Sequence, residues 1–180
     1  MIGRTALSSM LGAFLIFSSS GCGSSPTQAV AGSPTPDSLA RSYVALVHNY
    51  WIQYKAAEGN VSLFTRVCWG NPSAAGPGDA GDPRVVDPPR CREIATAILP
   101  AHESFLSNLD TTPAPAKFAA DDQVLRSQLP KAIAAVKAMV AAAAVGNRAA
   151  VIQYMTAYVE AMVPPVLDAL NDVDPSVVHD

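Results

Sequence analysis

Residues 131–159 read KAIAAVKAMVAAAAVGNRAAVIQYMTAYV, and this stretch decides the fold. Its first half is dominated by alanine, the residue with the highest intrinsic helix propensity. Its second half spaces apolar residues by three and four, which is the period of one helix face. Gly146 and Asn147 stand between the halves as a C-terminal stop and a new N-terminal cap. We therefore predict two helices, over about 116–145 and 148–170, joined by a tight turn.

Two more long helices are expected towards the N-terminus. Thr35-Pro36-Asp37 combines a hydroxyl cap, a proline at the first helical position and an acid at the positive end of the dipole. The apolar spacing that follows predicts a helix up to about Gly59. A second one is predicted from about Asp87-Pro88-Pro89 to Asp110. We also favour helix for residues 61–69, because nothing else in the chain offers a strand to pair with them.

Prolines interrupt three of these patterns, at Pro100, Pro130 and Pro164-Pro165. A proline inside a helix removes a hydrogen bond and bends or breaks the helix. With four long amphipathic helices and no convincing strand, the predicted fold class is all-α, an antiparallel four-helix bundle with proline-kinked helices. The sequence leaves open whether the bends create a groove or are simply tolerated.

The first 21 residues have the three parts of an export signal. Arg4 is their only charge, the apolar run from Leu11 to Phe17 is too short to span a bilayer, and Ser18 to Gly21 are small. Cys22 follows directly. We therefore predict a signal peptide over residues 1–21.

Ser20-Gly21-Cys22 resembles the end of a bacterial lipoprotein signal, although Ser19 stands where Leu or Val is commonest. With its Ser/Thr/Pro tether and its Pro- and Ala-rich helical domain, the chain resembles the small cell-envelope lipoproteins of actinobacteria, including mycobacteria. The resemblance implies an acyl (palmitate-type) lipid anchor on Cys22 and a place on the extracytoplasmic face of the cell membrane. It implies no activity. Ala29-Val30-Ala31 has the form of an ordinary secretory cleavage site, which would instead remove Cys22.

The expected organisation is therefore a signal peptide (1–21), a flexible tether (22–35) and a helical domain (36–180). The tether is expected to be flexible because it contains small polar residues, proline and glycine without charge. Within the domain, residues 70–89 contain five prolines and four glycines and are predicted to form a long loop. The acidic end from Asp168 to Asp180 is expected to fray.

With Cys22 assigned to the lipid, Cys68 and Cys91 remain as a pair in an oxidising compartment, where a disulfide is the expected state. They enclose 22 residues, and closing such a loop stabilises a fold by roughly 3 kcal/mol in the chain-entropy model. Metal binding or redox chemistry is the alternative. No C-x-x-C spacing and no nearby histidine supports it.

Charge and motifs exclude several classes of function. Removing Arg4 leaves 11 basic and 15 acidic residues, whereas nucleic-acid binding needs a basic face. The chain has no Glu-x-x-His pair for a di-metal bundle and no nucleophile elbow. The aromatic stripe on the first helix is interpreted mainly as packing, and His102 as a surface or hydrogen-bonded residue. A haem ligated by His102 together with Met139, Met155 or Met162 is the rarer alternative.

We therefore expect no catalytic residues, no metal and no cofactor. The leading hypothesis is a membrane-anchored extracytoplasmic lipoprotein whose domain is a non-enzymatic binding or interaction module. Its partner would be an envelope protein or a lipid, and nucleic acid is not expected. The alternative is a carrier that holds a lipid or a haem-like ligand in a groove of the bundle.

Overall fold

A computed structural model describes residues 35–59, 61–70 and 81–178. The predicted signal peptide, Cys22, the tether before Thr35 and the centre of the Pro/Gly loop lie outside the described residues. Within the described ranges the chain is helical and contains no strand, so the all-α prediction is confirmed. No helix among these residues is long and apolar enough to cross a membrane.

The helices begin and end close to the positions that the local signals predict. In chain order they are α1 (Pro36–Glu58), α2 (Val61–Trp69), α3 (Pro88–Thr111), η1 (Ala116–Phe118), α4 (Ala119–Ala144), α5 (Arg148–Ala161), η2 (Met162–Val166), α6 (Leu167–Val173) and η3 (Pro175–Val178). Thr35, Asp87 and Asn147 cap α1, α3 and α5 by accepting a backbone N–H on their side chains. Gly146 takes the positive φ of 69° that lets the chain leave α4 and enter α5.

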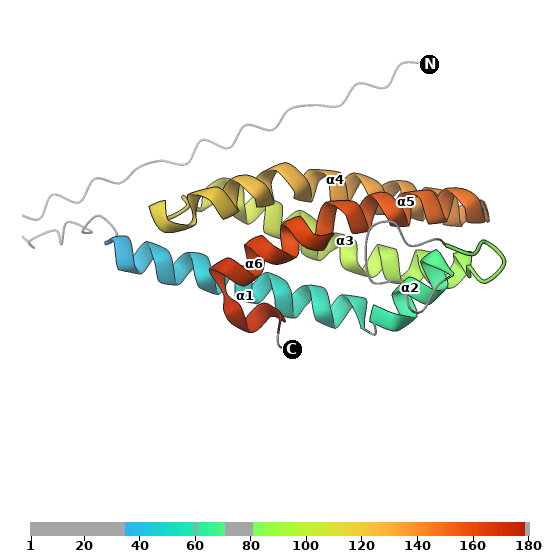
Figure 1. The fold of residues 1–180 in the computed structure, drawn as a ribbon, viewed down its shortest axis with the longest axis horizontal. Helices are drawn as coiled ribbons and strands as arrows, with labels where there is room; N and C mark the ends of the chain where they lie inside the picture. The colour runs from blue at the N-terminus through green and yellow to red at the C-terminus, as the bar shows by residue number, and fades with distance from the viewer. Residues whose placement is uncertain (1–34, 60, 71–80, 179–180) are drawn as a thin grey trace, which may run out of the picture. The chain divides into compact units, whose positions relative to one another are not determined.

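The long helices pack in neighbouring pairs, α1 with α3, α3 with α4 and α4 with α5 (Figure 1). The short helix α2 packs against α3 and α5, whereas α6 packs against α4 and approaches α1. One continuous apolar core joins all six α-helices.

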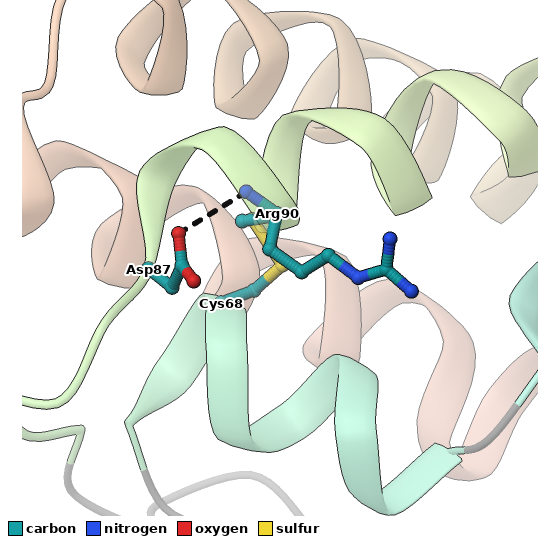
Figure 2. The surroundings of a disulfide bond; sticks show 4 residues. Cys68, Asp87 and Arg90 are labelled. Atoms are coloured by element: carbon teal, nitrogen blue, oxygen red, sulfur yellow. Dashed lines mark hydrogen bonds between the residues drawn. A yellow bond between two sulfur atoms is a disulfide. The ribbon is translucent and has the colours of Figure 1, made fainter.

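A disulfide joins Cys68, near the end of α2, to Cys91, in the first turn of α3 (Figure 2). Both cysteines are fully buried. Beside them, the Asp87 side chain accepts the backbone N–H of Arg90 and caps α3. The predicted pairing is therefore present, and it fixes α2 to the helix that follows the loop.

The chain returns from the loop by running along the end of α2. Asp82 and Asp87 donate their backbone N–H groups to the carbonyls of Trp69 and Val67, at 3.0 and 2.9 Å. Gly70 adopts a φ of +73°, and a Cβ there would meet the Asp82 carbonyl oxygen at 2.1 Å. Glycine is needed at this position for both its conformation and its lack of a side chain. The loop is also two residues shorter than predicted, because Pro88 and Pro89 open α3.

The prediction for the C-terminal part was wrong in two respects. The helix from Arg148 ends at Ala161 rather than near Leu170, because Val163 leaves helical geometry (φ −119°, ψ 120°) before a cis Val163–Pro164 bond. The segment from Asp168 is not frayed, since α6 and η3 continue to Val178. Val173 and Val177 are buried in the core, which offsets the acidity of the segment.

Candidate functional site

Five polar side chains on three helices form a chain of hydrogen bonds inside the bundle. Tyr50, Tyr54 and Glu58 stand at intervals of four on α1, so they line one face of that helix. His102 comes from α3 and Tyr158 from α5. All five are buried, and His102 is fully so. We call this set the Glu58 chain.

The hydrogen bonds run from Tyr50 to Glu58 without a gap. The Tyr50 hydroxyl lies 2.8 Å from Nδ1 of His102, and Nε2 of His102 lies 3.2 Å from the Tyr158 hydroxyl. Tyr158 donates to the Tyr54 hydroxyl at 3.2 Å, and Tyr54 donates to Oε1 of Glu58 at 2.6 Å. The length of the last bond is typical of a charge-assisted bond between a hydroxyl and a carboxylate.

These partners fix the direction of every proton in the chain. Because Tyr158 donates to Tyr54, its oxygen is the acceptor for Nε2–H of His102. A neutral imidazole carries one N–H, so Nδ1 accepts the hydroxyl proton of Tyr50. Each donor then faces an acceptor, and each hydrogen bond is donated to the next member of the chain in the direction of the Glu58 carboxylate.

Burial keeps the histidine and the tyrosines of the chain in these protonation states. Burial lowers the pKa of His102 from 6.5 to about 4, so the imidazole is neutral at pH 7. Burial also raises the pKa values of Tyr50, Tyr54 and Tyr158 well above the ordinary value for tyrosine. The pKa of Glu58 is raised by burial, although the hydrogen bond from Tyr54 and the charge of Lys55 act against that shift.

The Glu58 end of the chain borders a partly open cleft of about 160 Å³. The cleft lies between α1, α2, α5, η2 and the start of α6. Its walls are mostly apolar and include Phe64, Met155, Val159, Met162 and Leu167. The helical backbone is interrupted at η2, which forms part of this wall. The irregular backbone near Pro164 therefore lies beside the cleft.

The cleft gathers the polar atoms that the fold leaves unpartnered. Among the described residues, three buried side-chain nitrogen or oxygen atoms have no hydrogen-bond partner: Nε1 of Trp51, Nε1 of Trp69 and Oε2 of Glu58. All three residues line this cleft. A buried donor or acceptor without a partner costs about 1–3 kcal/mol, and such groups in native proteins require a specific explanation.

Lys55 is the nearest charge to the free carboxylate oxygen. Its ammonium nitrogen lies 4.0 Å from Oε2 of Glu58, at the limit of an ion pair and beyond a hydrogen bond. The same nitrogen lies 5.6 Å from the ring centroid of Trp51, within the range of a cation–π contact. The residues that carry this carboxylate, this ammonium and the two indole N–H groups thus line a mostly apolar cleft, and the unpartnered atoms themselves are buried in its wall.

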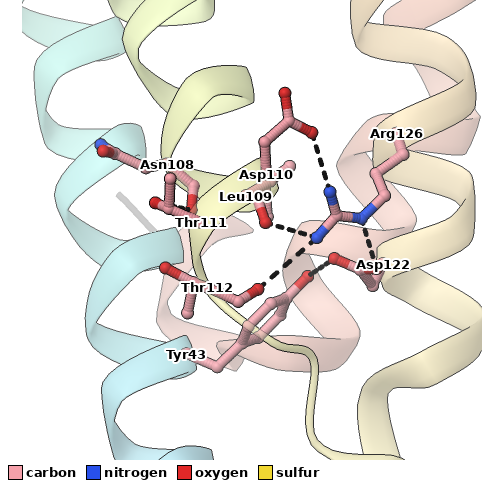
Figure 3. Close-up of polar contacts among 8 residues, drawn as sticks. All are labelled: Tyr43, Asn108, Leu109, Asp110, Thr111, Thr112, Asp122 and Arg126. Atoms are coloured by element: carbon pink, nitrogen blue, oxygen red, sulfur yellow. Dashed lines mark hydrogen bonds and ion pairs between the residues drawn. The ribbon is translucent and has the colours of Figure 1, made fainter.

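A second buried network on α1 differs because it is complete (Figure 3). The Tyr43 hydroxyl donates to Oδ1 of Asp122 at 2.8 Å, and Nε of Arg126 donates to Oδ2 at 2.7 Å. Arg126 also pairs with Asp110 at 3.0 Å and donates to the Leu109 carbonyl at the end of α3. We call this set the Asp122 network, and it joins α1, α3 and α4. No local sequence pattern indicated these contacts of Asp122.

His48, Asp174 and Ser176 also meet, although no sequence pattern predicted this contact. Nδ1 of His48 lies 2.9 Å from Oδ2 of Asp174 and 3.4 Å from the Ser176 hydroxyl. A Ser–His–Asp relay needs the serine and the acid on opposite ring nitrogens. Here both contact the same nitrogen, so the cluster holds η3 against α1 and is not arranged as a catalytic triad.

The structure places the remaining residues that the sequence singled out. Tyr43, Tyr50 and Tyr54 pack in the core as expected, but the partners of their hydroxyl groups were not predicted. Both ring nitrogens of His102 are engaged by tyrosines, so the described geometry offers neither one to a haem iron. In the described part of the chain, no group of three or more His, Cys, Asp or Glu is arranged to hold a metal ion.

The charged residues that flank Cys91 lie at the surface. Arg84 pairs with Asp82 at 2.8 Å and Arg90 with Glu93 at 2.5 Å, and both arginines are exposed. Surface pairs of this kind contribute little to stability. They give no indication of a binding site for an anionic partner.

Comparisons with protein-family models, with curated proteins and with solved structures found no match to this chain. The functional argument therefore rests on the cleft and on the Glu58 chain.

Proposed function

We propose that this protein is a lipid-anchored lipoprotein of the cell envelope whose helical domain is a non-enzymatic binding module. In this proposal Cys22 carries the acyl anchor and the tether holds the domain at the extracytoplasmic face of the membrane. The domain binds a small molecule in the cleft between α1, α2, α5 and η2. We also propose that the domain is a bundle of four antiparallel helices that bend at Pro100, Pro130 and Pro164-Pro165.

The observation that carries the proposal is the position of the unpartnered polar atoms. Random packing faults would be scattered through a domain, whereas these three belong to residues lining one cleft. Ligand sites are typically concave and mostly apolar, with a few polar groups that orient the ligand. A bound molecule would supply the partners that the fold does not.

The cleft favours a ligand carrier over a module that binds only proteins. A protein interface of standard size buries about 800 Å² per partner and rests on a broad exposed surface. The features described above are instead recessed and small. Of the three proline sites, only Pro164-Pro165 lies beside the cleft wall, so it alone supports the idea of a groove made by a helix break.

Native mass spectrometry of the protein purified from an expressing bacterium tests this proposal. We expect a co-purifying molecule that is released when the protein unfolds. Val163→Phe, which places an aromatic ring in the cleft wall, should abolish that mass, whereas Ile52→Phe on the exposed side of α1 should retain it. An empty wild-type protein that also fails to bind any added apolar probe would contradict the proposal.

The anchor is tested separately. Cys22→Ala should abolish incorporation of labelled palmitate and release the protein or leave it as an unprocessed precursor. Unchanged labelling would show that Cys22 is not the acylated residue, and it would leave the cleft proposal intact.

A further inference from the structure

We infer that the cleft binds a neutral, mainly apolar molecule that carries a hydroxyl group, with this group donating to Oε2 of Glu58 and accepting from an indole N–H. This inference rests on the proposed function and specifies the class of its ligand. It follows from the unmet hydrogen-bonding capacity of the cleft, its charge and its size.

The unpartnered atoms require a group that both donates and accepts. The carboxylate oxygen of Glu58 can only accept, and the indole N–H groups of Trp51 and Trp69 can only donate. A hydroxyl group has one donor and two acceptor positions. A single hydroxyl group can therefore give partners to both kinds of atom.

A cationic ligand provides fewer hydrogen-bond partners for these three atoms than a hydroxyl group does. Although a carboxylate among aromatic rings could attract an ammonium group, the Lys55 ammonium already lies 4.0 Å from Oε2 of Glu58. A second cation would be repelled by Lys55. An ammonium group also has no acceptor, so the indole N–H groups would stay unpartnered.

Anionic and purely apolar ligands leave Oε2 of Glu58 without a hydrogen-bond donor. A carboxylate ligand would face Glu58 with like charge, and it would offer no donor to Oε2. A hydrocarbon would leave all three polar atoms without partners. The neutral hydroxyl avoids both penalties.

The size of the cleft limits the rest of the ligand. An apolar cavity of about 150 Å³ in another protein holds benzene, so a cleft of about 160 Å³ suits a body of similar or slightly larger size. Phe64, Met155 and Leu167 provide apolar contacts for such a body. A substituted ring, or the end of a longer molecule that projects from the open side, meets this limit.

The Glu58 chain holds the acceptor in place. Tyr54 engages Oε1 at 2.6 Å and is itself supported by Tyr158 and His102, so the carboxylate cannot turn its partnered oxygen towards the cleft without losing that bond. Oε2 is therefore presented as a fixed acceptor. Pre-organised polar groups of this kind reduce the cost of binding.

Four probes with nine non-hydrogen atoms each can separate the ligand classes. They are 4-ethylphenol, 4-methylanisole, 4-ethyltoluene and 4-methylbenzylamine, which carry a hydroxyl, an ether, a methyl group and a cationic amine. The full chain with Cys22→Ala provides a form without the lipid. Because both tryptophans of the chain line the cleft, their two indole N–H resonances report binding in NMR titrations.

We expect 4-ethylphenol to bind at least about tenfold more tightly than the other three probes and to shift an indole N–H resonance downfield. In Glu58→Gln, the amide keeps an oxygen for Tyr54 and replaces Oε2 with an NH₂ group. This change should lower the affinity for 4-ethylphenol roughly tenfold or more and leave the affinity for 4-ethyltoluene unchanged, since a hydrogen bond to a charged group contributes about 1.5–3 kcal/mol.

Other outcomes would overturn the inference in distinguishable ways. Equal or tighter binding of 4-ethyltoluene would show that the cleft takes apolar ligands without a hydroxyl, and it would leave the proposed function standing. Tighter binding of 4-methylbenzylamine would assign the cleft to cations. If no probe binds and Val163→Phe behaves like the wild type, both the inference and the cleft as a ligand site are wrong.

Discussion

Tyr43 and Tyr54 lie eleven residues apart on the same helix, and each donates its hydroxyl to a buried carboxylate. At Asp122 both oxygens are engaged, one by Tyr43 and the other by Arg126. At Glu58 only the oxygen that faces Tyr54 has a partner. The two carboxylates therefore start from the same kind of contact and end in different environments.

We assign the Asp122 network to stabilisation of the fold and propose that the Glu58 chain serves binding. The Asp122 network balances charge and ties the end of α3 to α1 and α4, and both oxygens of its carboxylate have a partner within the protein. The Glu58 chain leaves one acceptor unused at a cleft, which lowers stability but prepares a site. Proteins commonly accept such local costs at functional sites. The predictions below test whether the two regions differ in this way.

The largest effect is expected from Asp122→Asn. The amide cannot accept from both Tyr43 and Arg126, so one buried donor loses its partner and the guanidinium loses its counter-charge. We expect the free energy of unfolding to fall by about 3 kcal/mol, the upper end of the range for a lost hydrogen bond to a charged group, because Tyr43 and Asp122 are buried although Arg126 is partly exposed. Urea unfolding followed by circular dichroism measures this change.

Arg90→Met is the matched control, since it breaks an ion pair at an exposed site with Glu93. It should change the free energy of unfolding by less than about 0.5 kcal/mol. If Asp122→Asn is as mild as this control, the Asp122 network does not have the stabilising role assigned to it.

The second effect is a dependence of stability on pH that comes from the Glu58 chain. Burial lowers the pKa of His102 from 6.5, the ordinary value for histidine, to about 4. Between pH 4 and pH 6.5 the unfolded protein therefore binds a proton at His102 that the folded protein does not bind. The stability should therefore fall as the pH is lowered through this window. Glu58 acts in the opposite direction, because burial raises its pKa and the folded state holds its proton more readily.

We expect a net loss of about 2 kcal/mol between pH 6.5 and pH 4, somewhat less than the His102 shift alone would give. His102→Gln removes the titrating group and should flatten this slope in urea unfolding series. An unchanged slope in His102→Gln would contradict a buried neutral His102.

A comparable effect is expected from Tyr158→Phe, which cuts the Glu58 chain in the middle. The change removes the acceptor of Nε2–H of His102 and the donor to Tyr54, and we expect a loss of about 2 kcal/mol. Tyr50→Phe removes a single partner at the far end of the chain and should cost about 1 kcal/mol. Equal losses in urea unfolding would mean that the chain does not act as a connected unit.

Local signals in the sequence predicted most of the helix boundaries. Thr35, Asp87 and Asn147 act within three residues of their own position, and the structure places each of them as an N-cap. The pairing of Cys68 with Cys91 needed only the count of cysteines and the expected compartment. Such features depend on short stretches of chain, so a sequence read alone contains the information.

The candidate site depends on contacts that no local pattern contains. Tyr50 and His102 are 52 residues apart and His102 and Tyr158 are 56 apart, so the aromatic stripe on α1 indicated a buried face but not the partners of its hydroxyls. The C-terminal error has the same origin. Asp174 meets His48, which lies 126 residues away, and composition alone could not indicate that partner.

The smallest effect on stability, and the one that separates the two regions most sharply, is expected from Glu58→Gln. It is the same carboxylate-to-amide change as Asp122→Asn, but here the amide keeps the acceptor for Tyr54 and removes a buried charge whose other oxygen has no partner. Relief of that desolvation should leave the free energy of unfolding unchanged or raise it by up to about 1 kcal/mol. Urea unfolding of the two amide variants side by side measures the contrast. A loss as large as that of Asp122→Asn would mean that Oε2 is paired in the folded protein, and Glu58 would then be a structural residue like Asp122.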